Sequence, residues 1–337
     1  TTHPRRCSCA CSPSAERTVP NMESAKAVGL LKRIGLDSQV LVFMRGGDAA
    51  CQLEWLGRLQ AAFLRSVPFE NQDIHDGRPL DIALGATYAK VVDRHRGGLC
   101  FELNSLFADL LLALGLKDVI TPACTMWVGG EPGTPSGDHM AVVATVGGRR
   151  YLVDVGNGID IGDPVPLDGD DWTYAEGARY FVAPAPCEGE DYDASETEAT
   201  EAMGDGLLAL WIERPGEPPF VRYSFRPEHA PRESFAAAMT HCESSPDSVF
   251  VRQPLATLRT AHGRVSLSEH HLTTTFDGEK RKQKLEGPAH REKLLRDAFG
   301  FRPQARFTGT VRAAARAAAG MASGSSVRMC ARHMAPF

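Results

Sequence analysis

The chain has 337 residues, which is enough to bury a substantial core and to divide into two or three units. It carries 37 Lys and Arg against 42 Asp and Glu, a formal charge of −5, and no basic stripe, so we expect no nucleic-acid partner. No apolar stretch approaches the roughly 18 residues of a membrane span, and we expect no membrane partner. Nine irregularly spaced cysteines do not form a disulfide framework and indicate a reducing compartment, which we expect to be the cytoplasm.

Residues 1–20 are set apart by their composition. They contain Arg5, Arg6 and Arg17, several serines and a single acid, Glu16. We expect a disordered leader. A transit peptide is the alternative, because such peptides are rich in Arg and Ser and poor in acids.

Helical patterns dominate residues 21–117, which we expect to form a helical bundle. Apolar residues recur at helical spacing between Leu53 and Phe63, and this helix should end before Pro68. The bundle should also carry the nucleophile described next.

The segment Arg-Gly-Gly-Leu-Cys-Phe-Glu-Leu-Asn at 96–104 contains the most informative residue, Cys100. It lies where a glycine-containing loop should turn into an amphipathic helix that ends at Gly115. A helix N-terminus favours the thiolate, which is the nucleophilic form of cysteine. The alternative is a small buried residue without a chemical role. The apolar positions that define this helix are Leu103, Leu106, Phe107, Leu110, Leu111 and Leu114.

Residues 118–230 have glycine and proline between short apolar runs, and we expect them to form a β-barrel-like domain. Within it, the runs 138–146 and 151–155 flank a short glycine turn, a pattern typical of a β-hairpin. The stretch 187–206 differs, because it holds eight acids and no Lys or Arg. It should be a solvated acidic insertion.

The register of the hairpin follows from its loop. If Gly147 and Gly148 form a two-residue loop, Asp154 lies opposite Ala141, and His139 shares the face of Asp154 at the diagonal position. Diagonal partners are about 7–8 Å apart at the backbone, so the carboxylate can reach the imidazole. A carboxylate in an apolar strand needs such a partner, because burying it alone costs free energy.

Cys100, His139 and Asp154 together have the chemistry of a nucleophile, a general base and an orienting group. The alternative for His139 is a surface or hydrogen-bonded residue without a catalytic role. His270 and His271 form a second histidine pair, but adjacent residues of a strand point to opposite faces. We therefore expect no metal.

Residues 231–302 mix helix and strand patterns, whereas 303–337 contain five Arg and no acids and are rich in Ala, Gly and Ser. We expect a mixed α/β unit followed by a basic, disordered tail; an amphipathic surface helix is the alternative for the tail. The elements predicted in the α/β unit are a helix at 234–239, strands at 255–259 and 271–276, and a helix at 289–299.

Four segments resemble motifs of the arylamine N-acetyltransferases. Val-Pro-Phe-Glu-Asn at 67–71 and the Cys100 segment resemble the active-site motifs of that family, and the segments around His139 and Asp154 resemble its His and Asp motifs in the same order. The resemblance runs from about Leu31 to Phe301 and weakens after Pro166.

The resemblance implies an acetyl-coenzyme A dependent acyltransferase with a ping-pong mechanism. Cys100 would carry the acetyl group, His139 would act as base, Asp154 would orient His139, and an arylamine or arylhydrazine would accept the group. The implied fold is α/β (α+β): an N-terminal helical bundle, a central β-barrel-like domain and a C-terminal α/β lid around a cysteine-protease-like catalytic core.

Further residues take roles from the same resemblance. Phe69 would line the acceptor pocket, and Asn157 stands where the family usually has an aromatic residue bordering that pocket. Glu70 and Arg96 are expected to form a buried ion pair that sets the loop before Cys100, and solvent-facing positions are the alternative.

No Gly-x-x-x-x-Gly-Lys loop is present, so coenzyme A would be held in another way. Ser136 and Gly137, at the end of a glycine-rich loop, are the candidates, because such loops present backbone N–H groups to anions. A plain connecting loop would have the same composition.

Two other functions fit the same residues. One is a hydrolase of the peptidase or transglutaminase kind, which also orders Cys, His and Asp along the chain. The other is a non-catalytic protein that binds coenzyme A or an aromatic ligand. The sequence gives no indication of the oligomeric state.

Overall fold

The structure is a computed structural model. It describes residues 22–133, 135–158, 161–169, 171–175, 177–186 and 206–302. The expected leader 1–20, the acidic insertion up to residue 205 and the expected tail 303–337 lie outside these residues. Within them, no helix is both long enough and apolar enough to cross a membrane.

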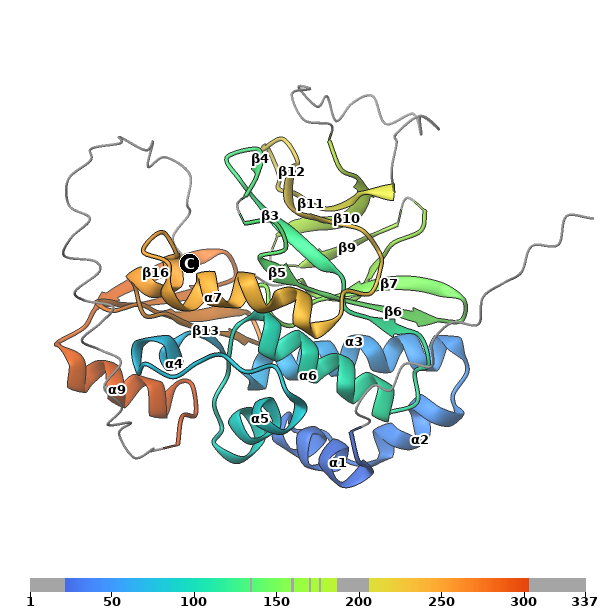
Figure 1. Cartoon of the computed structure of the whole chain (residues 1–337), viewed down its shortest axis with the longest axis horizontal. Helices are drawn as coiled ribbons and strands as arrows, with labels where there is room; N and C mark the ends of the chain where they lie inside the picture. Colours follow the sequence, from blue (N-terminus) through green and yellow to red (C-terminus); the bar gives the residue numbers. More distant parts are fainter. Residues whose placement is uncertain are drawn as a thin grey trace, which may run out of the picture.

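The N-terminal part of the chain is helical, and its helices lie together below the strands in Figure 1. Helix α3 ends before Pro68, as the sequence predicts, and begins at a cap in which Asp48 accepts the N–H of Cys51 at 2.8 Å. The elements are α1 (Ser24–Arg33), α2 (Gln39–Gly46), α3 (Ala49–Ser66), α4 (Gln72–His75), α5 (Leu84–Tyr88), the π-helix η1 (Ala89–Asp93) and α6 (Cys100–Ala113).

Helix α6 begins at Cys100, which confirms the predicted start. The prediction of an amphipathic helix is wrong, because every residue of α6 except Leu112 is buried. The helix packs against α1 and α5 on one side and against β2, β5 and β6 on the other, so it has no solvent face. Its polar side chains Glu102, Asn104 and Asp109 are therefore buried and need partners inside the protein.

The middle of the chain forms two open sheets among the described residues, so the domain that was expected to be β-barrel-like is not a closed barrel. A barrel needs every strand to pair with two neighbours in a ring, whereas β4 and β9 end one sheet and β2 and β8 end the other. The first sheet has the order β4 (Glu131–Pro132), β3 (Ala123–Val128), β12 (Phe220–Phe225), β11 (Leu208–Glu213), β10 (Ala178–Pro184), β9 (Trp172–Ala175), with β5 (His139–Met140) also paired to β3. The second has the order β2 (Val119–Ile120), β6 (Val142–Val146), β7 (Arg149–Val153), β8 (Val165–Pro166).

The predicted hairpin is strands β6 and β7, and its register is confirmed: Val146 pairs with Arg149, and Val142 with Val153. The chain changes sheets at Ala141, since β5 pairs with β3 and β6 pairs with β2 and β7. Because β5 pairs with β3, His139 lies outside the hairpin, where the two sheets meet.

The C-terminal part carries a third sheet, in which β1 joins four later strands. The predicted strands and final helix are present within one or two residues of their expected bounds. The elements are β1 (Phe69–Glu70), β13 (Ala256–Thr260), β14 (Gly263–Leu267), β15 (His271–Phe276) and β16 (Glu279–Lys284) in that order in the sheet, with η3 (Arg232–Phe235), α7 (Ala236–Ser244), α8 (Val249–Arg252) and α9 (Pro288–Asp297).

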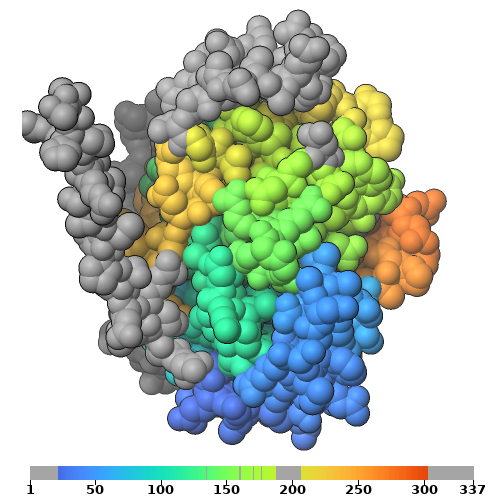
Figure 2. Space-filling view, turned by 90° about the vertical axis from the view of Figure 1, so that its right-hand side faces the viewer, coloured from blue at the N-terminus to red at the C-terminus, as the bar shows by residue number. Residues whose placement is uncertain are grey.

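The largest hydrophobic core lies between the helices and the hairpin. It combines residues of α1, α3 and α6 with residues of β6 and β7, and it includes Cys100 itself. Figure 2 shows the helical part at the bottom and the strand-rich middle of the chain directly above it. The boundary between these two parts is where the chemistry-bearing side chains meet.

Candidate active site

The carboxylate of Asp154 lies at the centre of the site and is fully buried. Two donors reach its Oδ1: Asn104 Nδ2 at 2.8 Å and the N–H of Gly156 at 2.9 Å. Three donors reach its Oδ2: His139 Nε2 at 2.8 Å, Asn157 Nδ2 at 3.1 Å and the Tyr223 hydroxyl at 3.1 Å.

These contacts decide the protonation state of Asp154. Burial alone would raise the pKa of the carboxyl, but the electrostatic interaction with His139 and the donated hydrogen bonds outweigh it and hold the pKa below its ordinary value. Asp154 is therefore an anion, which only accepts hydrogen bonds, and the five donors crowd its two oxygens beyond the about four lone-pair sites of a carboxylate, so some of them share a site.

His139 is the first residue of β5 and is buried beside Asp154. Its ring packs against Tyr223 with a centroid distance of 4.9 Å, so Tyr223 contacts both members of the His–Asp pair. Because Nε2 donates to Asp154, Nδ1 is the ring nitrogen left for a substrate or a nucleophile.

Cys100 lies against the backbone on both sides of His139. Its Sγ is 4.0 Å from the carbonyl oxygen of Asp138, and the N–H of Met140 donates toward the sulfur. Among the described residues, no hydrogen bond joins Sγ to the imidazole ring.

Burial raises the pKa of the Cys100 thiol well above its ordinary value, with a smaller contribution in the same direction from Cys242, and the Met140 N–H acts against this rise. Burial at the start of helix α6 therefore acts against the thiolate, whereas the helix N-terminus favours it. Sulfur becomes nucleophilic here only if a neighbouring base removes its proton.

Asn104 and Gly156 fix the distance between the helix and the Asp154 loop. Asn104 donates to the carbonyl of Met140 at 2.6 Å and to Asp154, and its Oδ1 accepts the N–H of Val155 at 2.9 Å. A Cβ on Gly156 would lie 2.7 Å from Cys100 Cα, so only glycine permits this approach.

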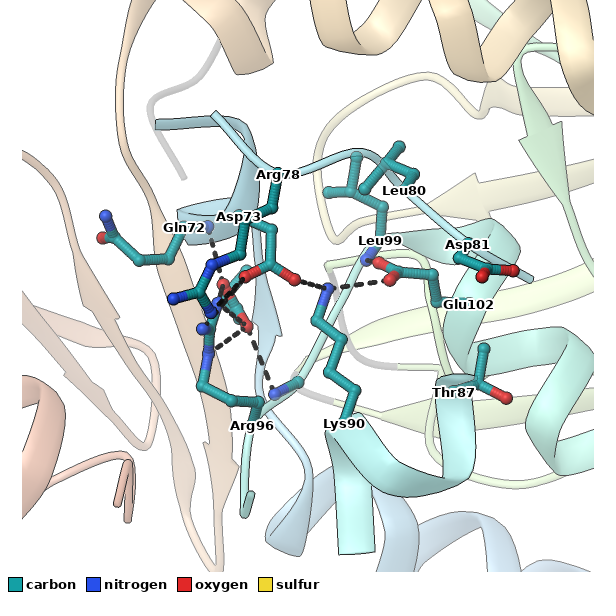
Figure 3. A network of polar contacts seen from close by, with 12 residues as sticks. Gln72, Asp73, Arg78, Leu80, Asp81, Thr87, Lys90, Arg96, Leu99 and Glu102 are labelled. Atoms are coloured by element: carbon teal, nitrogen blue, oxygen red, sulfur yellow. Dashed lines mark hydrogen bonds and ion pairs between the residues drawn. The ribbon is translucent and has the colours of Figure 1, made fainter. Parts of the chain in front are cut away.

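The loop before Cys100 is held by a second set of charged side chains, which we call the ion-pair network: Glu70, Asp73, Lys90, Arg96 and Glu102. Figure 3 labels the last four of them. Arg96 binds Glu70 through two hydrogen bonds of 2.9 Å, and both side chains are buried, which confirms the predicted ion pair. Arg96 also lies 3.1 Å from Asp73.

Lys90 joins the two halves of the ion-pair network. Its Nζ lies 2.8 Å from Asp73 and 2.7 Å from Glu102, and Glu102 accepts the N–H of Leu99 at 3.0 Å, one residue before the nucleophile. Burial alone would lower the pKa of Lys90, but the carboxylates of Glu102, Glu70 and Asp73 raise it above its ordinary value. Lys90 is therefore a cation, and it lies on the π-helix η1.

The remaining predicted site residues lie around the central pair. Phe69 lines a pocket together with Val155 and Gly158, beside the Asp154 loop. Asn157 is buried, and its side chain bridges Asp154 and Arg222, whose Nε donates to Asn157 Oδ1 at 2.9 Å. The other residues that line the pocket are Leu64, Val67, Thr257, Leu258 and Arg259.

Ser136 and Gly137 lie just before β5 and are both attached to β3. The Ser136 hydroxyl is 3.0 Å from that of Thr125, and the Gly137 N–H donates to Thr125 Oγ1 at 3.2 Å. In the described part of the chain, no group of three or more His, Cys, Asp or Glu side chains could hold a metal ion.

The comparison with known proteins agrees with this geometry. A family model described as N-acetyltransferase matches residues 52–307, which makes the chain a member of a class of acyltransferase enzymes. The arylamine N-acetyltransferase of Mycolicibacterium smegmatis is 29% identical over 255 residues, which are 74% of this chain and 82% of that protein. The chain belongs to the arylamine N-acetyltransferase family.

Solved structures of the family have the same fold. The enzyme of Mycobacterium marinum in complex with CoA matches with a TM-score of 0.65 and 25% identity, over 81% of this chain and 92% of that one. An enzyme of Bacillus cereus, described as having a unique Cys-His-Glu catalytic triad, matches with a TM-score of 0.69 and 23% identity, over 82% of this chain and 99% of that one.

Proposed function

We propose that this protein transfers an acetyl group from acetyl-coenzyme A to the nitrogen of arylamines or arylhydrazines, through an acetyl group carried on Cys100. The observation that carries the proposal is the 2.8 Å hydrogen bond between His139 and Asp154, formed next to the backbone on which Cys100 Sγ packs. Membership of the family supports the same reaction.

In the first half-reaction, His139 Nδ1 takes the proton of the Cys100 thiol as the sulfur attacks the thioester carbonyl. The bond between the carbonyl carbon and the sulfur of coenzyme A then breaks, and His139 returns the proton to the leaving thiol. Asp154 stabilises the imidazolium that exists between these two events. The exchange of one thioester for another is nearly isoenergetic, so Cys100 can also give up the acetyl group.

In the second half-reaction, the amine nitrogen attacks the acetyl carbonyl on Cys100. An aromatic amine is largely neutral near pH 7, so its lone pair is available. His139 takes the proton that the nitrogen loses, the bond between Sγ and the carbonyl carbon breaks, and the sulfur recovers the proton. No metal takes part.

The pocket beside the Asp154 loop is the proposed acceptor site. Phe69 would contact the aromatic ring, and Asn157, which precedes the pocket residue Gly158 and is held by Asp154, would border the site. Ser136 and Gly137 would contact coenzyme A, because they lie shortly before His139 in the chain. Both bond to the Thr125 side chain of β3, which fixes their place beside that strand.

We also propose a division of labour along the chain. Residues 21–117 would supply the nucleophile, 118–230 the base and its partner, and 231–302 a lid over the cleft. The cytoplasm is the proposed compartment, because a thiol nucleophile works only while it remains reduced.

Intact-mass spectrometry tests the acetyl-enzyme directly. Incubation with acetyl-coenzyme A should add the mass of one acetyl group, and a later aromatic hydrazine should remove it. Cys100→Ser should take up none, because a serine hydroxyl is far less acidic than a thiol. Cys51→Ser, which removes a partly buried free thiol outside the site, is the matched control and should be acetylated normally. Peptide cleavage without an acetyl adduct would instead indicate a hydrolase.

A further inference from the structure

The side chain of Asn157 lies between a carboxylate and a guanidinium. Its Nδ2 donates to Asp154 Oδ2 at 3.1 Å, and its Oδ1 accepts a hydrogen bond from Arg222 Nε at 2.9 Å. Arg222 Nη2 also donates to the backbone oxygen of Asn157, at 3.3 Å. One guanidinium therefore holds the side chain and the main chain of Asn157 at the same time.

The two neighbours decide which way the Asn157 amide faces. An asparagine amide carries an acceptor oxygen and a donor nitrogen at equivalent places, so either end can face a given partner. A guanidinium has only donors, and an ionised carboxylate has only acceptors. The amide oxygen must therefore face Arg222 and the amide nitrogen must face Asp154. Arg222 thus ensures that Asn157 presents a donor to the carboxylate.

Arg222 reaches this position because strand β12 is irregular. Tyr223 and Val221 pair with adjacent residues of β11, so Arg222 between them is an extra residue without a partner in the ladder. In a regular strand, Arg222 and Tyr223 would point to opposite faces. A β-bulge of this kind redirects a side chain, and here both side chains bond to the loop at 154–157.

The charges of Arg222 and Asp154 act on each other across the amide. Burial lowers the pKa of Arg222, and Asp154 is the strongest influence that acts against this lowering. Hydrogen bonds in such a chain polarise and strengthen one another. Asn157 is 4% exposed, so water competes little for its bonds. The hydrogen bond from Asn157 to Asp154 is therefore stronger with Arg222 in place than it would be from an isolated amide.

Asn157 contacts the carboxylate oxygen that faces the base. Asp154 Oδ2 also accepts from His139 Nε2 at 2.8 Å and from Tyr223, whereas the donors to Oδ1 come from helix α6 and from the loop itself. Donors at both oxygens oppose rotation of the carboxylate about its Cβ–Cγ bond. Loss of a donor at Oδ2 would weaken this restraint on the oxygen that meets the imidazole.

We propose that Asn157, held by Arg222, is a positioning residue for the acid–base pair. It keeps Oδ2 of Asp154 directed at the imidazole, so that His139 takes the proton of the thiol. This inference rests on the proposed acyl transfer. Neither Asn157 nor Arg222 is among the described residues that line the pocket, so we expect their effect to pass through Asp154 and not through contact with a substrate.

A double-mutant cycle tests the order in which these residues act. Asn157→Leu keeps a side chain of similar size and removes both of its hydrogen bonds. We expect the acetylation rate of Cys100 at saturating acetyl-coenzyme A to fall about 10- to 100-fold, the value of a hydrogen bond to a charged group. Arg222→Met should lower this rate about 10-fold. The double variant should be as slow as Asn157→Leu alone, because Arg222 acts only through Asn157.

The concentration of acetyl-coenzyme A that gives half of the maximal acetylation rate should change less than about 3-fold in all three variants. A disturbance of the substrate pocket would instead raise that concentration. If the losses of the two single variants multiplied in the double variant, Arg222 and Asn157 would act independently and the proposal would be overturned.

Two further variants separate the hydrogen bonds from a general effect of charge. Arg222→Lys keeps a cation that has only donors and should regain part of the rate. Arg214→Met removes an equal charge from an exposed position and should leave the rate unchanged. Rates are expressed per folded molecule, with folding checked by circular dichroism. If Arg222→Met acetylated as fast as the wild type, or if Arg222→Lys recovered nothing, the proposal would be wrong.

Alkylation of Cys100 by iodoacetamide makes the test independent of acetyl transfer, because it needs the same removal of the thiol proton. Peptide mass mapping separates this thiol from the others. The wild type should react fastest, Arg222→Lys next and Asn157→Leu slowest. If the wild type forms no acetyl-enzyme but this order holds, the proposed reaction fails and the positioning role stands. If acetyl-enzyme forms and the variants are alkylated as fast as the wild type, the positioning role alone fails.

Discussion

The surroundings of Asp154 and the ion-pair network are both buried, but they balance their charges differently. In the ion-pair network, three carboxylates face Lys90 and Arg96 at distances of 2.7 to 3.1 Å. Around Asp154, one carboxylate faces neutral donors and an imidazole. The network is thus nearly neutralised by direct ion pairs, whereas among the described residues Asp154 forms no direct ion pair with Lys or Arg, and His139 is the residue that can carry a positive charge against it.

Because of this difference, we expect one region to control the reaction rate and the other to control the stability of the fold. A buried carboxylate that waits for a cation stabilises a transient imidazolium, since electrostatic stabilisation is strongest in a water-excluded site. A network whose charges are already paired cannot stabilise a new charge in this way. Its hydrogen bonds instead hold the loop from Arg96 to Leu99 in place. Changes near Asp154 should therefore mainly alter rates, and changes in the ion-pair network should mainly alter the free energy of unfolding.

Asp154→Asn should have the largest effect. An amide supplies one acceptor oxygen where five donors converge, and it cannot balance the imidazolium, so we expect acetylation of Cys100 to slow by about 10³- to 10⁴-fold. The rate is measured by intact mass on protein that circular dichroism shows to be folded. Asp109→Asn, a buried aspartate paired with Arg232, is the matched control and should leave the rate per folded molecule unchanged. An unaltered rate in Asp154→Asn would remove this residue from the mechanism.

Lys90→Met should have the next largest effect, and on stability. It leaves Asp73 and Glu102 buried without their shared cation, which costs about 3–5 kcal/mol of unfolding free energy, measurable by urea denaturation. The double change Lys90→Met with Glu102→Gln should recover part of the loss, because it also removes one of the uncompensated charges. If Lys90→Met slowed the acetylation of Cys100 without lowering the free energy of unfolding, the ion-pair network would not have the structural role assigned to it.

Tyr223→Phe should have a moderate effect on rate. It removes one donor to Asp154 and keeps the ring that packs on His139, so we expect about a 10-fold slower acetylation, in line with one hydrogen bond to a charged group. The melting temperature should change little. Tyr180→Phe, on strand β10 of the same sheet, changes a buried tyrosine that is not among the residues bonded to Asp154 and serves as the comparison.

The pH dependence of stability should distinguish the two regions most finely. The pKa of Asp154 is lowered in the folded protein, so its contribution is complete above about pH 4, the unfolded value, and is lost as the pH falls through the folded value. The pKa of Lys90 is raised, so its contribution is complete below about pH 10 and is lost as the pH rises through the folded value. Urea midpoints across pH should show the alkaline loss in the wild type and not in Lys90→Met.

Local patterns in the sequence predict much of this site. Glycines before an apolar heptad-like run place the start of α6 at Cys100, and the two-glycine loop fixes the register of the hairpin that leads to Asp154. The pairing of Glu70 with Arg96 follows from the resemblance to the family and is present in the structure.

Contacts between segments that are distant in the sequence cannot be predicted from such local patterns. Tyr223 and Arg222 come from β12, whose pairing with β3 and β11 has no signal in a single sequence, and the bulge at Arg222 depends on that pairing. Asn104 belongs to the Cys100 segment that the sequence analysis singles out. Its hydrogen bonds to Met140, Asp154 and Val155 form only because α6 packs against β5, which the sequence does not predict. The expected barrel is wrong for a related reason, because the change of sheets at Ala141 depends on which distant strands are available to pair.

The three contacts of Asn104 have a mechanical consequence. The helix that carries the sulfur also carries the amide that ties together the peptide after His139 and the start of the loop at Val155. Any shift of α6 pulls the acid–base pair along with it. A change in the spacing between the sulfur and the acid–base pair would therefore have to break hydrogen bonds of Asn104.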